Sequence, residues 1–256
     1  MILIEAAGLG GERLPLVLVP GLLASGIGSL VWIGMGAWTG LSTADISISG
    51  LQLTAFPSPG FADFAWTVVL AAAVAVAMVA IFRFAGEARR VLVRHSYLLL
   101  PATGLLVAGL AIAFSQIAGK STGEVIFSGQ DSLGPLVEDA GSWSVAALAL
   151  LIGFKGLAYG LSLGGFRGGP VFPSMFLGAA AGLIAAQLPG FSTAPAVAVG
   201  IGAAVVAVLG LPLSAAVLGI ALTASAGPGV DPLVIVGVIV AYLVRLALTD
   251  PPAATG

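Results

Sequence analysis

Residues 168–230 read GGPVFPSMFLGAAAGLIAAQLPGFSTAPAVAVGIGAAVVAVLGLPLSAAVLGIALTASAGPGV and contain no charged side chain. As one helix, this segment would extend about 95 Å, roughly three times the thickness of the hydrocarbon core of a bilayer. The segment must therefore turn back on itself. Pro189-Gly190 and Gly210-Leu211-Pro212 supply the breaks. They predict helices over residues 171–188, 194–209 and 212–226.

Helices this short span a bilayer poorly, because a transmembrane helix needs about 20 apolar residues. Broken or re-entrant helices are tolerated only where they face protein or a water-filled cavity. The 37 glycines and 15 prolines of the chain point the same way, since simple membrane anchors are unbroken. We therefore expect an all-α, polytopic membrane protein with broken or re-entrant helices.

The composition of the whole chain agrees with this expectation. Of the 256 residues, 59% are hydrophobic and only 8% are charged, whereas a soluble domain has about 25% charged residues. This excludes soluble enzymes and secreted scaffolds, and the net charge of −2 gives no basic surface for nucleic acid. The chain has no cysteine and one histidine, so we expect no metal site, no cofactor and no enzyme activity.

Other apolar runs predict further membrane spans. These cover residues 14–37, 64–82, 98–117, 140–166 and 232–249. The link between the second and third of them carries Arg83, Arg89, Arg90, Arg94 and His95, which places this link in the cytoplasm by the positive-inside rule. The basic link either orients the chain only or also binds a lipid or a partner.

The sharpest motif is GGFRGGPVFP at residues 164–173, where glycines and a lone arginine precede a helix that opens with proline. The free amides of a helix N-terminus attract anions, and glycines let the backbone approach an ion closely. The Val171 and Phe172 amides would then hold a small anion with no full charge beside it, which suits release during transport. The alternative is a tight turn between packed helices, with Arg167 extended to the membrane interface.

Lys155 lies within an apolar segment, where a charge costs about 2.5–3.5 kcal/mol at the centre of the bilayer. It either raises the potential along an anion route, together with Arg167, or extends to the interface. Carboxylates are almost absent from the apolar segments, so a proton relay has no clear members. The stretch Ser128–Ser132 indicates a loop or a helix cap.

These motifs resemble the CLC family of chloride channels and proton-coupled anion exchangers. Residues 168–173, followed by Met175-Phe176-Leu177-Gly178, are similar to the anion motif in the second half of that family, G-G-x-F-x-P before an apolar helix. Three further stretches resemble family motifs in the same order. They are Ile2–Glu5, Ser128–Pro135 and Gly202–Ala207 with Leu211–Ser214. The resemblance covers essentially all of the chain.

The resemblance implies an all-helical, CLC-like fold, present here in part. In the family this fold is a homodimer built from two inverted repeats, with one anion pathway per subunit. Residues 1–13 would end the first repeat, residues 14–249 would form the second, and residues 250–256 would be a tail. The family's G-S-G-x-P and G-[KR]-E-G-P motifs, the second of which carries the gating glutamate, have no counterpart. We therefore expect a missing N-terminal half.

The resemblance also implies an anion site. Its members would be Gly168, Gly169, Pro170, Val171, Phe172 and Pro173. Pro170 departs from the family because it lacks the N–H that faces the anion there, and Val171 stands where phenylalanine is usual. The local sequence is also similar to the fluoride-exporting branch of the family, in which an acidic residue stands where this chain has Pro170.

We therefore expect membrane transport of a small inorganic anion, chloride or a similar halide, by a multi-pass protein of the plasma membrane. The expected partners are that anion, membrane lipid, and a second copy of the chain or the missing half. Three alternatives stay open: a fluoride transporter, a secondary transporter of an organic anion, and a membrane subunit without transport. The sequence does not separate a channel from a proton-coupled exchanger.

Overall fold

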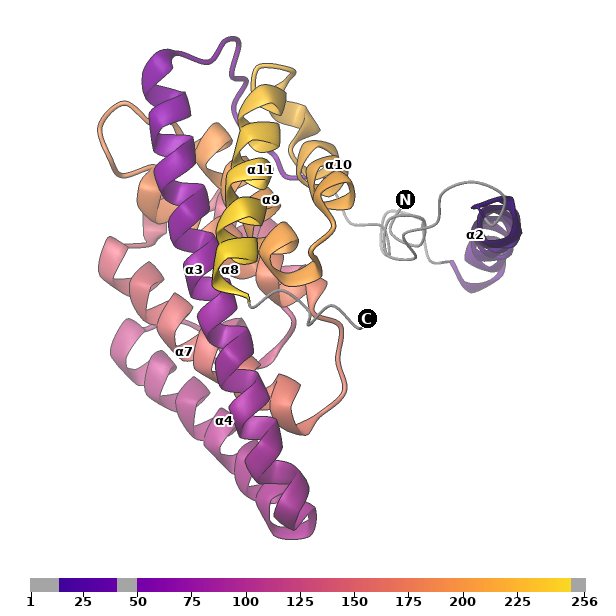
Figure 1. Ribbon diagram of the computed structural model, residues 1–256, viewed down its shortest axis with the longest axis vertical. Helices are drawn as coiled ribbons and strands as arrows, with labels where there is room; N and C mark the ends of the chain where they lie inside the picture. Colours follow the sequence, from indigo (N-terminus) through magenta and orange to yellow (C-terminus); the bar gives the residue numbers. More distant parts are fainter. Residues whose placement is uncertain (1–13, 41–49, 250–256) are drawn as a thin grey trace, which may run out of the picture. The chain divides into compact units, whose positions relative to one another are not determined.

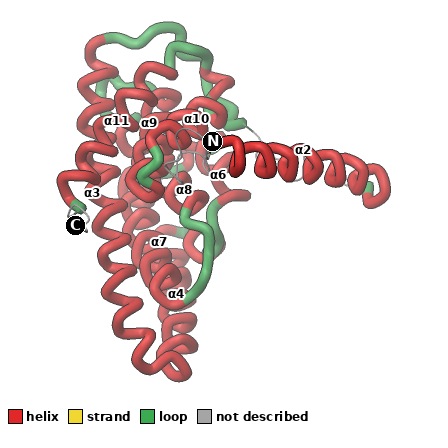
Figure 2. The backbone as a smooth tube through the Cα atoms, turned by 45° about the vertical axis from the view of Figure 1, so that its right-hand side comes forward, coloured by secondary structure: helices red, strands yellow, loops and turns green. Residues whose placement is uncertain are grey.

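The computed structural model describes residues 14–40 and 50–249, and every element in these ranges is a helix, with no strand among them (Figure 2). The chain divides into two compact units, residues 1–50 and 51–256. The first unit contains helix α2 (Leu14–Thr39), which begins where the sequence predicts its first span. The predictions made for residues 1–13 and 250–256 lie outside the described residues.

The second unit holds the remaining helices. The longer ones are α3 (Phe61–Leu92), α4 (Ser96–Ala118), α7 (Val145–Gly165), α8 (Val171–Ala185), α9 (Thr193–Leu209), α10 (Pro212–Leu222) and α11 (Asp231–Leu248), and two shorter ones, α5 (Gly123–Ile126) and α6 (Gln130–Glu138), lie between α4 and α7. Figure 1 shows α3 running along the unit, with α9 and α11 beside its first part and α4 and α7 beside its second.

The uncharged segment forms three short helices, as predicted. Helices α2, α3, α4, α7 and α11 are long and apolar enough to cross a membrane, whereas α8, α9 and α10 have 15, 17 and 11 residues. Gly210 ends α9 with a φ of 69°, a left-handed conformation that favours glycine, and Pro212 begins α10. Helices α8 and α10 end three and four residues earlier than predicted. The described fold is therefore the expected all-α arrangement with broken helices.

The prediction for the second span was wrong at its C-terminal end. Helix α3 continues for 32 residues to Leu92, so Arg83, Arg89 and Arg90 lie on a helix and not in a link. Charged side chains limit the length of helix that can lie in lipid. They do not end the helix itself, because alanine, glutamate and arginine are good helix formers. At 1.5 Å per residue, α3 extends about 48 Å, longer than the hydrocarbon core.

The core of the second unit is the crossing of α8 and α9. All residues of α9 from Ala194 to Ala207 are buried. A Cβ atom built on Gly178 would lie 2.2 Å from the carbonyl oxygen of Gly200, and one built on Gly200 would lie 2.1 Å from that of Gly178. Small residues allow this approach, which is how helices pack closely in membranes.

We expect Gly178→Ala and Gly200→Ala to destabilise the protein, because the methyl group would meet a rigid backbone oxygen and force α8 and α9 apart. The free energy of unfolding should fall by about 1–3 kcal/mol, the usual cost of overpacking a core. Thermal unfolding in detergent would measure it. Gly109→Ala on α4 is the matched control, since no atom lies within 4 Å of its Cβ position. Equal unfolding temperatures for all three variants would contradict the close crossing.

Candidate functional site

The chain turns back after the end of α7, so the first residues of α8 lie beside α7. Helix α7 ends at Gly165, and the turn that follows leads back along it to Val171, where α8 starts. The Tyr159 hydroxyl, six residues before the end of α7, donates a hydrogen bond of 2.8 Å to the carbonyl oxygen of Pro170. Since α7 is a candidate span, this bond holds the start of α8 within the length of a membrane-spanning helix.

The first amide groups of α8 are available to a ligand. Among the described residues, neither the Val171 nor the Phe172 N–H group makes a hydrogen bond. The third position is Pro173, which has no N–H. The Ser174 hydroxyl donates to the Val171 carbonyl at 2.6 Å and so leaves the amides unobstructed. The partial positive charge of the helix N-terminus is therefore directed at the turn of residues 166–170.

Lys155 supplies a full positive charge near this turn. Its side chain is only 1% exposed, so it is covered by protein and does not extend into solvent. The ammonium group donates to the carbonyl oxygens of Glu124 at 2.5 Å and Phe127 at 2.9 Å. It also lies 4.4 Å from the centre of the Phe176 ring. The charge is stabilised by the C-terminal carbonyls of α5 and by an aromatic face.

The segment between α4 and α7 folds back to meet Lys155. Gly129 immediately precedes α6 and has a φ of 89°, so this stretch leads into a helix without a capping side chain at the N-cap position. A Cβ atom at Gly129 would lie 2.7 Å from the Phe176 ring of α8. Only glycine fits both the conformation and the space. The contact brings Ser128 close to the start of α8.

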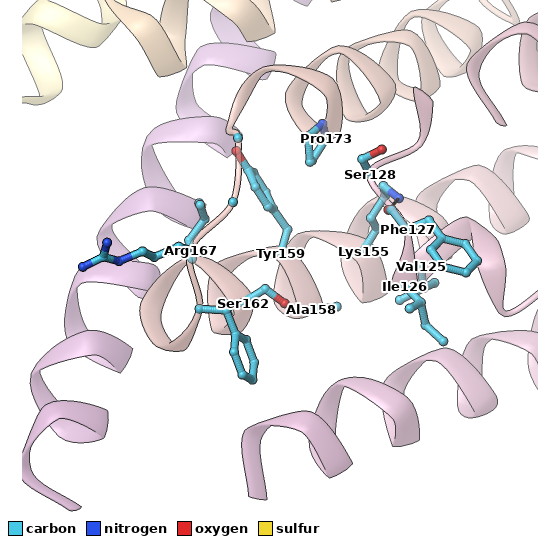
Figure 3. Close-up of a pocket in the computed structure, with 14 residues that line it drawn as sticks. Val125, Ile126, Phe127, Ser128, Lys155, Ala158, Tyr159, Ser162, Arg167 and Pro173 are labelled. Carbon is cyan, nitrogen blue, oxygen red and sulfur yellow. Dashed lines mark hydrogen bonds between the residues drawn. The ribbon is translucent and has the colours of Figure 1, made fainter. Parts of the chain in front are cut away.

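These elements enclose a cavity of about 190 Å³ (Figure 3). Of the predicted site residues, Lys155, Arg167, Gly168, Gly169 and Pro173 line it, together with Ser128, Tyr159 and Ser162. Pro170, Val171 and Phe172 do not contribute to its wall. The guanidinium group of Arg167 points away from Lys155 and Ser128 (Figure 3).

Sequence reasoning missed Tyr159, Ser162 and Ser128 as wall residues. The first two follow Lys155 by four and seven residues, and this spacing places all three on one face of α7. The helical spacing from Lys155 was therefore the signal for Tyr159 and Ser162. Ser128 reaches the cavity only through the fold of the link, for which the sequence gives no comparable signal.

Glu124 is the acidic residue nearest to Lys155. Its Oε2 atom is buried and has no hydrogen-bond partner. Burial raises the pKa of this carboxyl above its ordinary value, although a hydrogen bond with Ser132 and the charges of Lys155 and Lys120 act in the opposite direction. Within the described ranges, no group of three or more histidine, aspartate or glutamate side chains has a metal-binding arrangement.

Comparison with known proteins gives one match. The family model described as "Voltage gated chloride channel" matches residues 4–246 of the chain. No curated protein matches the chain, and no solved structure does.

We expect Glu124→Gln to raise the unfolding temperature near neutral pH, because the folded protein disfavours the charged carboxylate. Since the pKa of Glu124 is raised on folding, the wild-type protein gains stability as the pH falls through that pKa, and the difference from the variant shrinks. Thermal unfolding across pH 4 to pH 8 would measure this. Glu138→Gln, at an exposed position on α6, is the control. A difference between Glu124→Gln and wild type that stays constant with pH would contradict the buried carboxyl.

Proposed function

The chain belongs to the CLC family of voltage-gated chloride channels, and from this premise we propose that it moves chloride or a similar small anion past the start of α8. It is a multi-pass membrane protein of an anion-transporting family and not an enzyme. The proposal concerns the identity of the anion, the residues that bind it and the partners of the chain.

The observation that carries the proposal is that two independent sources of positive potential flank the turn of residues 166–170, part of which lines the cavity. The unpaired amides of Val171 and Phe172 and the ammonium group of Lys155 come from different helices, and both lie beside the turn of residues 166–170. Among the described residues, no carboxylate lines the cavity. An anion there would be stabilised strongly, because surrounding protein and lipid screen charges less than water does.

The same geometry accounts for release of the ion. Lys155 donates to the carbonyl oxygens of Glu124 and Phe127, so two of its three N–H donors are engaged and its attraction for an ion in the cavity is reduced. The amides carry only partial charges. Conduction requires a site that attracts an ion but also lets it leave. The partial charges of the α8 amides and the partly engaged charge of Lys155 would together attract an anion weakly enough for it to leave.

The size of the cavity favours a small inorganic anion. Its volume of about 190 Å³ is below the roughly 300–1,000 Å³ of typical pockets for organic ligands. Gly168 and Gly169 form part of the wall, and no atom lies within 4 Å of a Cβ position at either residue. This leaves room for a hydrated monatomic ion beside the backbone, which supports chloride or another halide over an organic anion.

We also propose that further protein covers the cavity. The turn formed by Phe166, Arg167, Gly168 and Gly169 is exposed, so one side of the cavity is not closed by the described residues. Opposing ligands and a gate would come from a first inverted repeat, and the subunit would act as a homodimer in the plasma membrane. Family membership supports these steps. Chloride flux through liposomes containing the 256-residue chain alone should then be small.

We expect Gly169→Asp to weaken chloride binding at least tenfold, because it places a carboxylate in the wall of the anion cavity. Gly169→Asn is the matched control, since it has nearly the same shape and no charge, and it should bind within about twofold of wild type. Isothermal titration calorimetry of the purified protein in detergent would measure both affinities. Equal affinities for the two variants, or binding of sodium in place of chloride, would contradict the proposal.

We expect Tyr159→Phe to weaken chloride binding about twofold to tenfold, because the start of α8 loses a hydrogen bond worth about 0.5–1.5 kcal/mol. The same calorimetry would measure it. Tyr97→Phe is the control, because Tyr97 is 96% exposed on α4. An unchanged affinity in Tyr159→Phe would show that this bond does not position the amides.

A further inference from the structure

A second cavity, of about 240 Å³, lies between α3, α9 and α11 and shares no wall residue with the anion cavity, although Phe82 in its wall packs against Tyr159 of the anion cavity. Two arginines line it, Arg83 from the middle of α3 and Arg245 from the last turn of α11. Most of the remaining wall is apolar and includes Val79, Phe82 and Val208. The anion pathway proposed above does not use this cavity.

The described part of the cavity wall carries positive charge and no balancing carboxylate. None of its described wall residues is acidic, and Glu87, one turn further along α3, pairs with Arg90 at 2.5 Å. Arg83 donates one hydrogen bond to the carbonyl oxygen of Leu248, the last residue of α11. Each guanidinium group has five N–H donors, so most of the donors in the cavity are available to a ligand.

The backbone of α9 fixes the position of Arg245. Its guanidinium group lies against Gly210, where a Cβ atom would come within 1.6 Å of the Nη1 atom. Gly210 is therefore needed both for the left-handed end of α9 and for the place of this side chain. The described residues provide no hydrogen-bond acceptor or carboxylate for Arg245, although the group is half-buried. A cation held in place without a partner is suited to bind an anionic group.

The length of α3 and its basic residues support a position for this cavity near a membrane interface. Arg83 follows Phe61 by 22 residues, which is about 33 Å along the helix and close to the thickness of the hydrocarbon core. The further basic residues Arg89, Arg90 and Arg94 follow, which indicates the cytoplasmic side by the positive-inside rule. Anionic lipids are enriched in that leaflet, and basic pockets between helices there bind their headgroups.

We propose that Arg83 and Arg245 bind the phosphate group of an anionic phospholipid in this cavity. The planar guanidinium group matches phosphate with two parallel hydrogen bonds, so two such groups can hold one phosphate from two sides. Phe84 and Leu246, the neighbours of the two arginines in sequence, are 38% and 50% exposed and offer apolar surface for the acyl chains. The bound phosphate group would connect α3 with the C-terminal ends of α9 and α11.

Native mass spectrometry of the full chain in detergent, with added dioleoylphosphatidylglycerol or dioleoylphosphatidylcholine, tests the proposal. Phosphatidylglycerol should bind to the wild-type protein more tightly than phosphatidylcholine does. The double variant R83Q/R245Q should weaken phosphatidylglycerol binding about 25-fold, since each arginine near a membrane surface contributes roughly fivefold. The matched control is R89Q/R90Q, which removes the same charge from exposed positions on α3 outside the cavity and should retain binding.

Arg245→Lys provides a second variant that keeps the charge if the double variant does not fold. It should weaken phosphatidylglycerol binding severalfold, because lysine lacks the paired donors of arginine. An equal loss in R89Q/R90Q and R83Q/R245Q, or equal binding of the two lipids to wild type, would overturn the proposal. Displacement of the lipid by 10 mM inorganic phosphate would assign the cavity to free phosphate and would overturn the lipid assignment.

Discussion

A helix that starts within the bilayer has amide groups that neither water nor lipid can satisfy, unless the protein encloses a cavity there. We propose that helix α8 starts in this way, because the Tyr159 hydroxyl holds Pro170 beside α7, which is a candidate membrane span. The turn before α8, Lys155 and the link that follows α5 line one cavity, and the Val171 and Phe172 amides follow that turn. The unsatisfied backbone is therefore the constraint from which the proposed site follows, and an anion is the ligand that we propose for it.

The core makes this arrangement rigid. Gly178 and Gly200 let α8 and α9 approach until their backbones touch, and α9 is enclosed by α3, α10 and α11. Gly129 then fixes the link against Phe176 of α8, so the same helix carries both the amides and the ring that faces Lys155. Small displacements of α8 would change the distance from the amides to Lys155, and close packing prevents such displacements.

The uncharged segment 168–230 was sufficient to predict the broken helices α8, α9 and α10, because length and the positions of proline and glycine decide where an apolar chain must turn. The C-terminal end of α3 could not be found in this way, since charge limits burial in lipid and not helix formation. Gly168, Gly169 and Pro173, which the sequence motif named as site residues, line the same cavity as Lys155. Ser128 was missed because its approach depends on contacts between distant segments, which no local pattern encodes.

The central claim is that the Val171 and Phe172 amides bind a small anion. The most direct measurement is the anomalous diffraction of bromide in crystals of the protein grown with bromide in place of chloride. The account predicts a bromide peak within hydrogen-bonding distance of both amide nitrogens, on the side of the cavity that Lys155 lines. A cation or an empty cavity at that place, with bromide bound only elsewhere, would contradict it.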